Sequence, residues 1–492
     1  MIRFDRHPRG HWCARARSGI IVVVADRSAC GGPGGGGGGR MAEARLTVER
    51  LRELVAEGAV ETVVLAVTDM QGRLQGKRLD AGYFLTEVLA AGAEGCGYLL
   101  AVDVEMNTVD GYTVSSWENG YGDLVFAPDL ATLRMVPWHP ATAMVQCDLA
   151  HHDGTPVAVS PRQVLRRQLE RLAGYGWGAY VGTELEFMVF RDSYEHAWAK
   201  HYQDLTPVNQ YNVDYSILGT ARIEPLLRRL RTGMAGAGLT VESAKGECNL
   251  GQHEIAFRYA DALTTCDDHA VYKTGAKEIA AQEGVSLTFM AKYDQREGNS
   301  CHVHLSLRDE RGRPVFPGEG PHGFSRTMEH FLAGQLACLD RFALLLAPTV
   351  NSYKRYVPGS FAPTAIAWGR DNRTCALRVV GHGASLRFEN RVPGGDVNPY
   401  LAVAALIAAG LHGVEHQLPL EPEFTGNAYA SDAPRVPATL REAVDRFERS
   451  EAATEAFGKD VVRHYAHAGR VELAAYDAAV TDWERRRGFE RL

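Results

Sequence analysis

The chain has 492 residues, of which 45% are hydrophobic and 23% are charged, a composition typical of soluble globular proteins. Its formal net charge of −7 argues against nucleic-acid binding, which needs a basic surface. Nine cysteines without a Cys-x-x-Cys pair favour reduced thiols in a cytoplasmic protein over a disulfide framework or a zinc ribbon.

Residues 1–40 differ in composition from the rest of the chain. A short apolar run from Ile20 to Ala25 is followed by an almost pure glycine tract. The run is too short to span a membrane, and ordering a glycine tract costs much conformational entropy. We therefore expect a disordered tail or a true start at Met41, and no membrane association.

From Met41 onward, short strands alternate with helices. Hydrophobic periodicity predicts an amphipathic helix directly after Met41 and another helix over 83–92. Strands are predicted over the ranges 61–69, 97–104, 123–128 and 142–150. Proline and glycine then mark a boundary, so we expect one domain over 41–150 and a second over 151–492.

The second predicted domain contains longer helices. They are expected over 161–176, 221–238, 266–284 and 398–414. The last of these is apolar on most of its faces, which is typical of a helix in the protein core.

Two glutamates stand two residues apart in the apolar strand predicted over 179–190. Glu184 and Glu186 therefore share one face of that strand. A solvated edge strand would explain them without any function. Because the neighbouring residues are largely apolar, we expect buried carboxylates, and a metal ion is the simplest partner that neutralises them.

Three further segments supply similar groups. Glu247 and Glu254 flank a bend expected at Gly251, His302 and His304 share one strand face, and Glu389 lies between two arginines. Oxygen-rich ligands with little nitrogen and no sulfur favour Mg²⁺ or Mn²⁺ over zinc. Arginines beside such metal ions indicate phosphoryl transfer, because both neutralise a transferring phosphate.

Six segments in this order and spacing resemble type I glutamine synthetases. They read VGTELEF, GECNLGQHE, GNSCHVHLSL, NSYKRYVPG, DNRTCALR and RFENRVPGGDVNPYLA. The resemblance covers essentially all of residues 41–492. It implies an α+β protein with an N-terminal β-grasp domain, followed by a catalytic domain whose antiparallel strands form an open funnel. It also implies a homo-dodecamer of two hexameric rings.

The resemblance further implies a role for each matching residue. One metal ion would be held by Glu186, Glu247 and Glu254, and a second by Glu184, His302 and Glu389. Glutamate would be bound by Gly298, His302, Arg355 and Arg391. Arg373 would face the transferred phosphate, and ATP would be bound by His304, Arg378 and Arg387. The implied reaction converts the γ-carboxylate of glutamate to an acyl phosphate, which an amine then displaces.

The chain departs from ammonia-using members of the family on the amine side. Phe361 stands where those members carry a glutamate that binds and deprotonates ammonium, and Glu297 replaces an asparagine. Asp103 is the candidate for the family's ammonium-binding aspartate. Because a phenyl ring offers apolar contact and a π face, Phe361 is expected to line a pocket for an organic amine.

In this respect the sequence is similar to the γ-glutamylamine ligases, including γ-glutamylpolyamine and γ-glutamylethanolamide synthetases. Two alternatives remain open at this point. One is an ammonia-using glutamine synthetase with a displaced base, and the other is a non-catalytic structural or regulatory relative. The complete set of candidate metal ligands argues against the second alternative.

Overall fold

The structure is a computed structural model, and it describes residues 45–492. The expectations for residues 1–40 and for a start at Met41 therefore concern residues outside the described range. The first helix, α1 (Val48–Ala56), begins after Thr47, whose side chain accepts a hydrogen bond from the backbone N–H of Arg50 at 3.2 Å. This N-cap explains why the amphipathic pattern becomes helical at that point.

The first sheet of the described chain has six strands in the order β2-β1-β6-β4-β3, with β5 also paired to β6. The strands are β1 (Thr62–Thr68), β2 (Leu74–Asp80), β3 (Ala93–Cys96), β4 (Asp123–Pro128), β5 (Arg134–Met135) and β6 (Thr142–Ala150). β1 runs parallel to β6, and the other pairs are antiparallel. The strands predicted over 61–69, 123–128 and 142–150 are thus confirmed.

Residues 81–91 are helical, as predicted, although in three short pieces. These are α2 (Ala81–Tyr83), the π-helix η1 (Phe84–Val88) and α3 (Leu89–Ala91). The strand predicted over 97–104 is wrong, because Gly97–Leu100 forms the 3₁₀ helix η2. Leu100, Ala101 and Val102 are buried in succession. A short run of consecutive apolar residues does not distinguish a buried strand from a buried helical turn.

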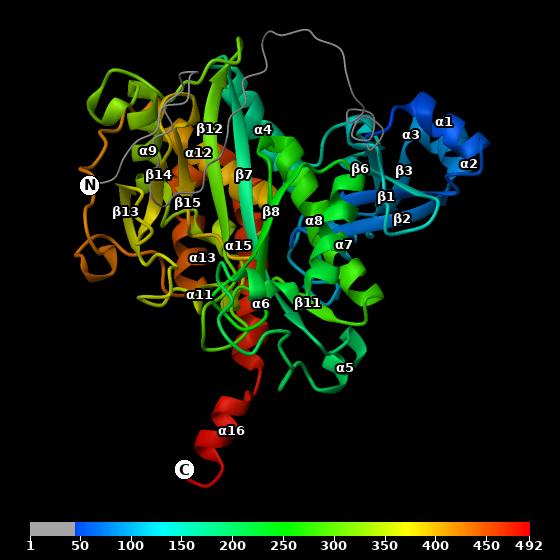
Figure 1. Ribbon diagram of the computed structural model, residues 1–492. Coiled ribbons are helices and arrows are strands. Elements are labelled where there is room, and N and C mark those ends of the chain that lie inside the picture. Colours follow the sequence, from blue (N-terminus) through cyan, green and yellow to red (C-terminus); the bar gives the residue numbers. More distant parts are fainter. Residues whose placement is uncertain (1–44) are drawn as a thin grey trace, which may run out of the picture. The chain divides into compact units, whose positions relative to one another are not determined.

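The second sheet has nine strands and carries the segments that the sequence singled out (Figure 1). Its order is β13-β14-β15-β12-β7-β9-β8, and β10 and β11 also pair with β7. The strands are β7 (Trp177–Phe190), β8 (Val241–Gly246), β9 (Gln252–Phe257), β10 (Ala260–Asp261), β11 (Ser286–Thr288), β12 (Cys301–Asp309), β13 (Ala365–Arg370), β14 (Cys375–Val380) and β15 (Arg387–Asn390). The pairing is antiparallel except between β13 and β14, as the family resemblance implied.

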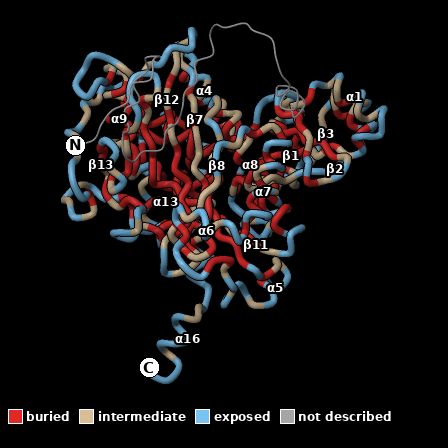
Figure 2. The backbone as a smooth tube through the Cα atoms, in the orientation of Figure 1, coloured by how far each residue is buried: buried red, intermediate tan, exposed pale blue. Residues whose placement is uncertain are grey.

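Helices pack against this sheet and against one another. The helices α4 (Pro161–Ala173), α7 (Glu224–Gly236) and α8 (Ala262–Gln282) match the predicted ranges. Helix α12 (Pro399–Glu415) packs against α4, α8 and α9 (Arg326–Cys338), and nearly all of its residues are buried. The prediction of an apolar core helix is confirmed. Many residues along β7 and β12 are buried, whereas the residues of α16 are mostly exposed (Figure 2).

The remaining helices are shorter or lie toward the C-terminus. The α-helices are α5 (Tyr194–Ala199), α6 (Ile217–Ala221), α10 (Ala343–Leu346), α11 (Val350–Tyr353), α13 (Leu440–Glu448), α14 (Glu451–Phe457), α15 (Lys459–Ala478) and α16 (Asp482–Gly488). The 3₁₀ turns are η3 (Leu130–Thr132), η4 (Pro321–Gly323), η5 (Gly383–Ser385) and η6 (Ala428–Ala430). Among residues 45–492, no helix has both the length and the apolar character that crossing a membrane requires.

Candidate active site

Three glutamates from neighbouring strands converge in the nine-stranded sheet. Glu186 on β7 pairs in register with Glu254 on β9, and Glu247 follows the end of β8. Gly251 in the β8–β9 turn has φ +71°, which confirms the predicted bend and brings Glu247 back toward Glu254. One carboxylate oxygen from each of the three residues lies within 4.8 Å of the others. All three residues are at most 9% exposed.

Burial and mutual repulsion raise the pKa values of the glutamates in this first cluster. Burial and the Glu247 charge raise the pKa of Glu186 to about 8. The pKa of Glu254 is raised well above its usual value by burial and by Glu184 and Glu247. Burial also raises the pKa of Glu247, although Lys245, which forms an ion pair with it, opposes this. A group of buried carboxylates that resist ionisation is the chemical setting in which a divalent cation binds favourably.

A second cluster joins Glu184, both histidines of β12 and Glu389. The register pairs His302 with Glu184 and His304 with Glu389. His304 Nε2 lies 2.9 Å from Glu184 Oε1, and His302 Nδ1 lies 3.3 Å from Glu184 Oε2 and 3.4 Å from Glu389 Oε1. The prediction that Glu184 and Glu186 share one strand face, and that His302 and His304 share another, is therefore confirmed.

The charges of the second cluster are balanced differently from those of the first. Burial would raise the pKa of Glu184, but His304 and His302 hold it well below its usual range. Glu389 is fully buried, and Arg391 outweighs this burial and lowers its pKa to about 2. Burial lowers the pKa of His302 to about 4, so its imidazole is neutral at neutral pH and can act as a metal ligand.

Arginines surround Glu389. Arg391 forms an ion pair with Glu389 Oε1, and Arg378 Nη1 donates to Glu389 Oε2 at 2.8 Å. Arg387 Nε donates to His304 Nδ1 at 3.2 Å. Arg373 is 48% exposed and lies 3.9 Å from Asp371, so its guanidinium is available to an anion. Three of the predicted arginines thus contact Glu389 or His304, and Arg373 lies in the turn between β13 and β14.

Arg355 and Gly298 are buried. Arg355 is 2% exposed and donates to Ser300 Oγ at 3.1 Å and to the carbonyl of Pro393 at 3.0 Å. A Cβ atom on Gly298 would lie 2.0 Å from the carbonyl oxygen of Ala291, so only glycine fits there. Arg355 therefore holds the backbone that follows Arg391, and its direct contact with glutamate stays a prediction.

Phe361, which is expected on the amine side, lies outside regular secondary structure and is more exposed than the carboxylates. Phe361 lies in the irregular segment between α11 and β13, is 56% exposed and has φ +59°, a value that costs energy for a bulky side chain. Arg391 Nη2 donates to the Phe361 carbonyl at 3.5 Å, and Tyr429 Oη donates to the Ala362 carbonyl at 3.0 Å. The segment that carries Phe361 is thereby joined to the arginine that binds Glu389.

The two candidate bases lie in different places. Glu297 is partly buried and adjoins Gly298, and its backbone carbonyl accepts a hydrogen bond from Asn249 at 2.7 Å. Asp103 accepts hydrogen bonds from the backbone and side chain of Asn107 at 2.8 and 2.9 Å. No contact recorded for the described residues of this chain joins Asp103 to the carboxylate clusters.

Sequence reasoning missed two groups that shape the first cluster. Gln252 Nε2 donates to Glu186 Oε2 at 3.0 Å and to the carbonyl of Gly298 at 3.0 Å. Lys245 pairs with Glu247. Alternation along β9 places positions 252 and 254 on the same face, so Gln252 could have been found from the sequence.

Comparisons with known proteins agree with this geometry. Residues 158–488 match the family described as glutamine synthetase, catalytic domain. The chain is 68% identical over 447 residues to a gamma-glutamylethanolamide synthetase of Streptomyces coelicolor, covering 91% of this chain and 96% of that protein. It is 36% identical over 448 residues to a glutamate–isopropylamine ligase of a Pseudomonas species, covering 90% and 98% of the two chains.

Solved structures show the same likeness. The structure titled GmaS/ADP complex superposes with a TM-score of 0.79 at 29% identity, covering 89% of this chain and 99% of that one. These matches agree with the nine-stranded sheet and its clustered carboxylates. The chain belongs to the glutamine synthetase family.

Proposed function

We propose that the protein is an ATP-dependent ligase that joins the γ-carboxylate of glutamate to a small primary organic amine, with ethanolamine as the first candidate. The observation that carries this proposal is the double contact of Arg391. Its guanidinium pairs with Glu389 in the carboxylate cluster and also reaches the backbone of Phe361 at 3.5 Å. The backbone of the residue that stands in place of the family's ammonium-binding glutamate is thus joined to the arginine that pairs with Glu389.

The named activities of the relatives support the same class of reaction. The relative at 68% identity is named for the ethanolamide product, and others are named as ligases for isopropylamine and methylamine. All three names describe the joining of a glutamyl group to an amine that carries carbon. This agreement favours an organic amine over ammonia as the substrate.

The donor set fits two divalent cations, for which Mg²⁺ or Mn²⁺ is proposed. Glu186, Glu247 and Glu254 would hold one. Glu184, His302 and Glu389 would hold the other, although the three residues whose ligand atoms lie within 4.8 Å of one another are Glu184, His304 and Glu389. The fit rests on the crowded and buried carboxylates of the first cluster, whose mutual repulsion a divalent cation would offset. When bound, such ions neutralise the phosphate charge of ATP during transfer.

The chain's own residues would then position the reactants. Gly298, His302, Arg355 and Arg391 bind and orient glutamate, while His304, Arg378 and Arg387 hold the nucleotide. The γ-carboxylate oxygen attacks the terminal phosphorus of ATP, ADP leaves, and Arg373 stabilises the charge on the transferred phosphoryl group. The amine nitrogen then attacks the acyl carbon and phosphate leaves, with the amine's proton passing to Glu297 or Asp103 as base.

The experiment that tests this proposal compares amines at fixed glutamate and ATP. The kcat/KM for phosphate release is measured with ammonium, methylamine, isopropylamine, ethanolamine and putrescine. We expect ethanolamine to exceed ammonium by about tenfold or more, because burying each methylene contributes about 0.8 kcal/mol. A higher kcat/KM for ammonium would identify a glutamine synthetase instead.

The proposal extends to organisation, with a β-grasp domain over 41–150, a catalytic domain over 151–492 and two stacked hexameric rings in the cytoplasm. Helix α16 supports an assembly, because it extends away from the packed elements (Figure 1). Its Trp483 is 66% exposed. Phe489, just after the helix, is 89% exposed. Light scattering of the purified protein tests the assembly, and a monomeric mass would contradict it.

A further inference from the structure

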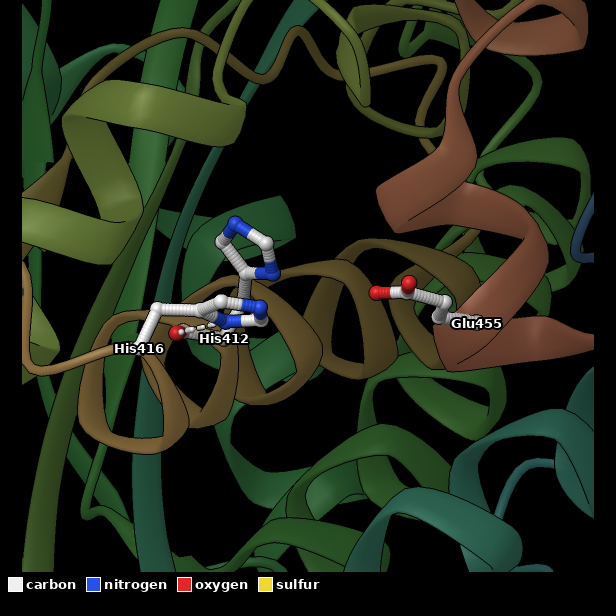
Figure 3. Close-up of side chains that lie close together, drawn as sticks. All are labelled: His412, His416 and Glu455. Atoms are coloured by element: carbon white, nitrogen blue, oxygen red, sulfur yellow. Dashed lines mark hydrogen bonds between the residues drawn. The ribbon is translucent and has the colours of Figure 1, made fainter.

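A second group of metal-type ligands lies away from the candidate active site, at the C-terminal end of α12. His412 and His416 are one helical turn apart, and Glu455 on α14 points its carboxylate toward their imidazoles (Figure 3). One ligand atom from each of the three lies within 4.8 Å of the others. The 17 residues of α12 place this group about 25 Å along the helix from its first residue, which follows the Arg391 segment.

The hydrogen bond of His416 prepares its ring for a metal ion. His416 Nδ1 lies 3.0 Å from the carbonyl oxygen of His412, and a carbonyl can only accept, so Nδ1 carries the proton. The lone pair is then on Nε2. A ring nitrogen that donates to a backbone carbonyl is the usual way in which proteins orient a metal-binding histidine.

The surrounding charges also favour a cation. Burial and the nearby His416 lower the pKa of His412, which keeps its imidazole neutral at neutral pH. The charges of Glu455 and Glu415 oppose that of Arg341 at His412, and Glu415 is itself paired with Arg171 at 2.9 Å. The C-terminal end of a helix, where the backbone carbonyls point outward, adds a further negative potential.

We propose that His412, His416 and Glu455 form a Zn²⁺ site that ties α12 to α14, with water in the fourth position. Two imidazoles at helical spacing i, i+4 and one carboxylate are a zinc-type donor set, distinct from the oxygen-rich set proposed for Mg²⁺. Tetrahedral Zn²⁺ with bonds of about 2.0–2.1 Å separates its ligand atoms by about 3.4 Å. His416 and Glu455 are exposed side chains, so they are free to close the remaining distance.

The role of this site would be structural. Helix α12 is buried on nearly all faces and follows β15, while α14 packs against it near the C-terminus. A bound ion at their junction would stabilise the folded state without contacting the substrates. Zn²⁺ should therefore raise the thermal midpoint and leave turnover unchanged.

The test uses the full chain with saturating Mg²⁺ and ADP, so that the active-site carboxylates are filled. Zn²⁺ binding is measured by equilibrium dialysis and by the shift in thermal midpoint, with Co²⁺ absorption as a report on the ligand geometry. Three single variants, His412→Ala, His416→Ala and Glu455→Ala, are compared with the unmodified chain. His152→Ala is the matched control, because it breaks an exposed pair of a histidine and Glu94, 3.6 Å apart, that belongs to no group of three close ligand atoms among the described residues.

We expect each of the three variants to lose one equivalent of bound Zn²⁺, or at least tenfold in affinity, together with the Zn²⁺-dependent rise in thermal midpoint. The control should keep both. Glutamate-dependent phosphate release with Mg²⁺ should be equal in all of these proteins, which shows that the fold is intact. Equal Zn²⁺ binding in the unmodified chain and in His416→Ala would overturn the proposal.

Discussion

The two halves of the candidate site are built from different kinds of structure. The carboxylates and histidines lie on β7, β9, β12 and β15, or directly after β8, where strand pairing fixes their backbones, and all but Glu184 and His304 are buried. Phe361 instead lies in an irregular segment, is 56% exposed and has a left-handed backbone conformation. On the proposed roles, phosphoryl transfer depends on a sheet with paired strands, whereas amine selection depends on a segment outside regular secondary structure.

The largest expected effect comes from breaking the rigid half. We expect Glu247→Ala to reduce glutamate-dependent phosphate release by about a thousandfold or more, because a bound metal ion contributes several kcal/mol to transition-state stabilisation. The fold should survive, since one of three mutually repelling buried carboxylates is removed. Glu310→Ala, at an exposed turn, is the control and should behave like the unmodified protein. Normal turnover by a folded Glu247→Ala protein would contradict the metal assignment.

The second prediction concerns how the stability of the folded chain depends on pH. Burial lowers the pKa of His464 to about 3, and its Nε2 lies 3.0 Å from the sulfur of Met70, which joins α15 to the turn after β1. The unfolded chain binds a proton below about pH 6.5 and the folded chain does not, so stability is lost as pH falls from 6.5 toward 3. From pH 6.5 to 5 this residue should account for about 2 kcal/mol.

Urea unfolding of the unmodified protein and of His464→Gln at both pH values measures this contribution. The glutamine keeps a donor but cannot be protonated in this range, so the variant should lose less stability on acidification. An equal pH dependence in the two proteins would show that His464 is not among the groups that make the scaffold acid-sensitive.

The third prediction concerns the less constrained half. Phe361→Ala should lower kcat/KM for ethanolamine by about tenfold, because apolar contact with two methylenes contributes about 1.4 kcal/mol or slightly more. The kcat/KM for ammonium should change little. Equal losses with both amines would mean that Phe361 positions the loop and does not select the amine.

The smallest expected effect is a change in stability at Phe361, which is opposite in sign to the change in activity. Phe361→Gly should raise the free energy of unfolding by about 1 kcal/mol, because glycine adopts positive φ without steric cost. Activity with ethanolamine should nevertheless fall as in Phe361→Ala. Ala362→Gly, at a buried residue without positive φ, is the matched control and should be destabilised. Loss of stability in Phe361→Gly would show that the ring makes packing contacts that outweigh its backbone strain.

Much of the rigid half could be predicted from the sequence, because strand alternation is a local property. The spacing of Glu184 and Glu186, and of His302 and His304, was enough to place each pair on one face. Residues 97–104 could not be assigned in the same way, since their consecutive apolar residues carry no period.

Other features depend on contacts between distant parts of the chain. The i, i+4 spacing of His412 and His416 is visible in the sequence, but nothing local indicates that Glu455 on α14 faces them. The positive φ of Phe361 is likewise invisible, because phenylalanine rarely adopts it and the surrounding hydrogen bonds impose it. The ion pair of Lys245 with Glu247 depends on how β8 is set beside β9.

The irregular segment that holds Phe361 has a consequence for how new activities arise in such proteins. Substitutions there leave the hydrogen-bonded strands and the buried carboxylates untouched, so on the proposed role of Phe361 they would change which amine is accepted at little cost in stability. Selection can then explore many side chains at positions 357–361, which are exposed or only partly buried, while the residues that carry out phosphoryl transfer are inherited unchanged. A library confined to these positions is accordingly the smallest one that we expect to interconvert amine preferences.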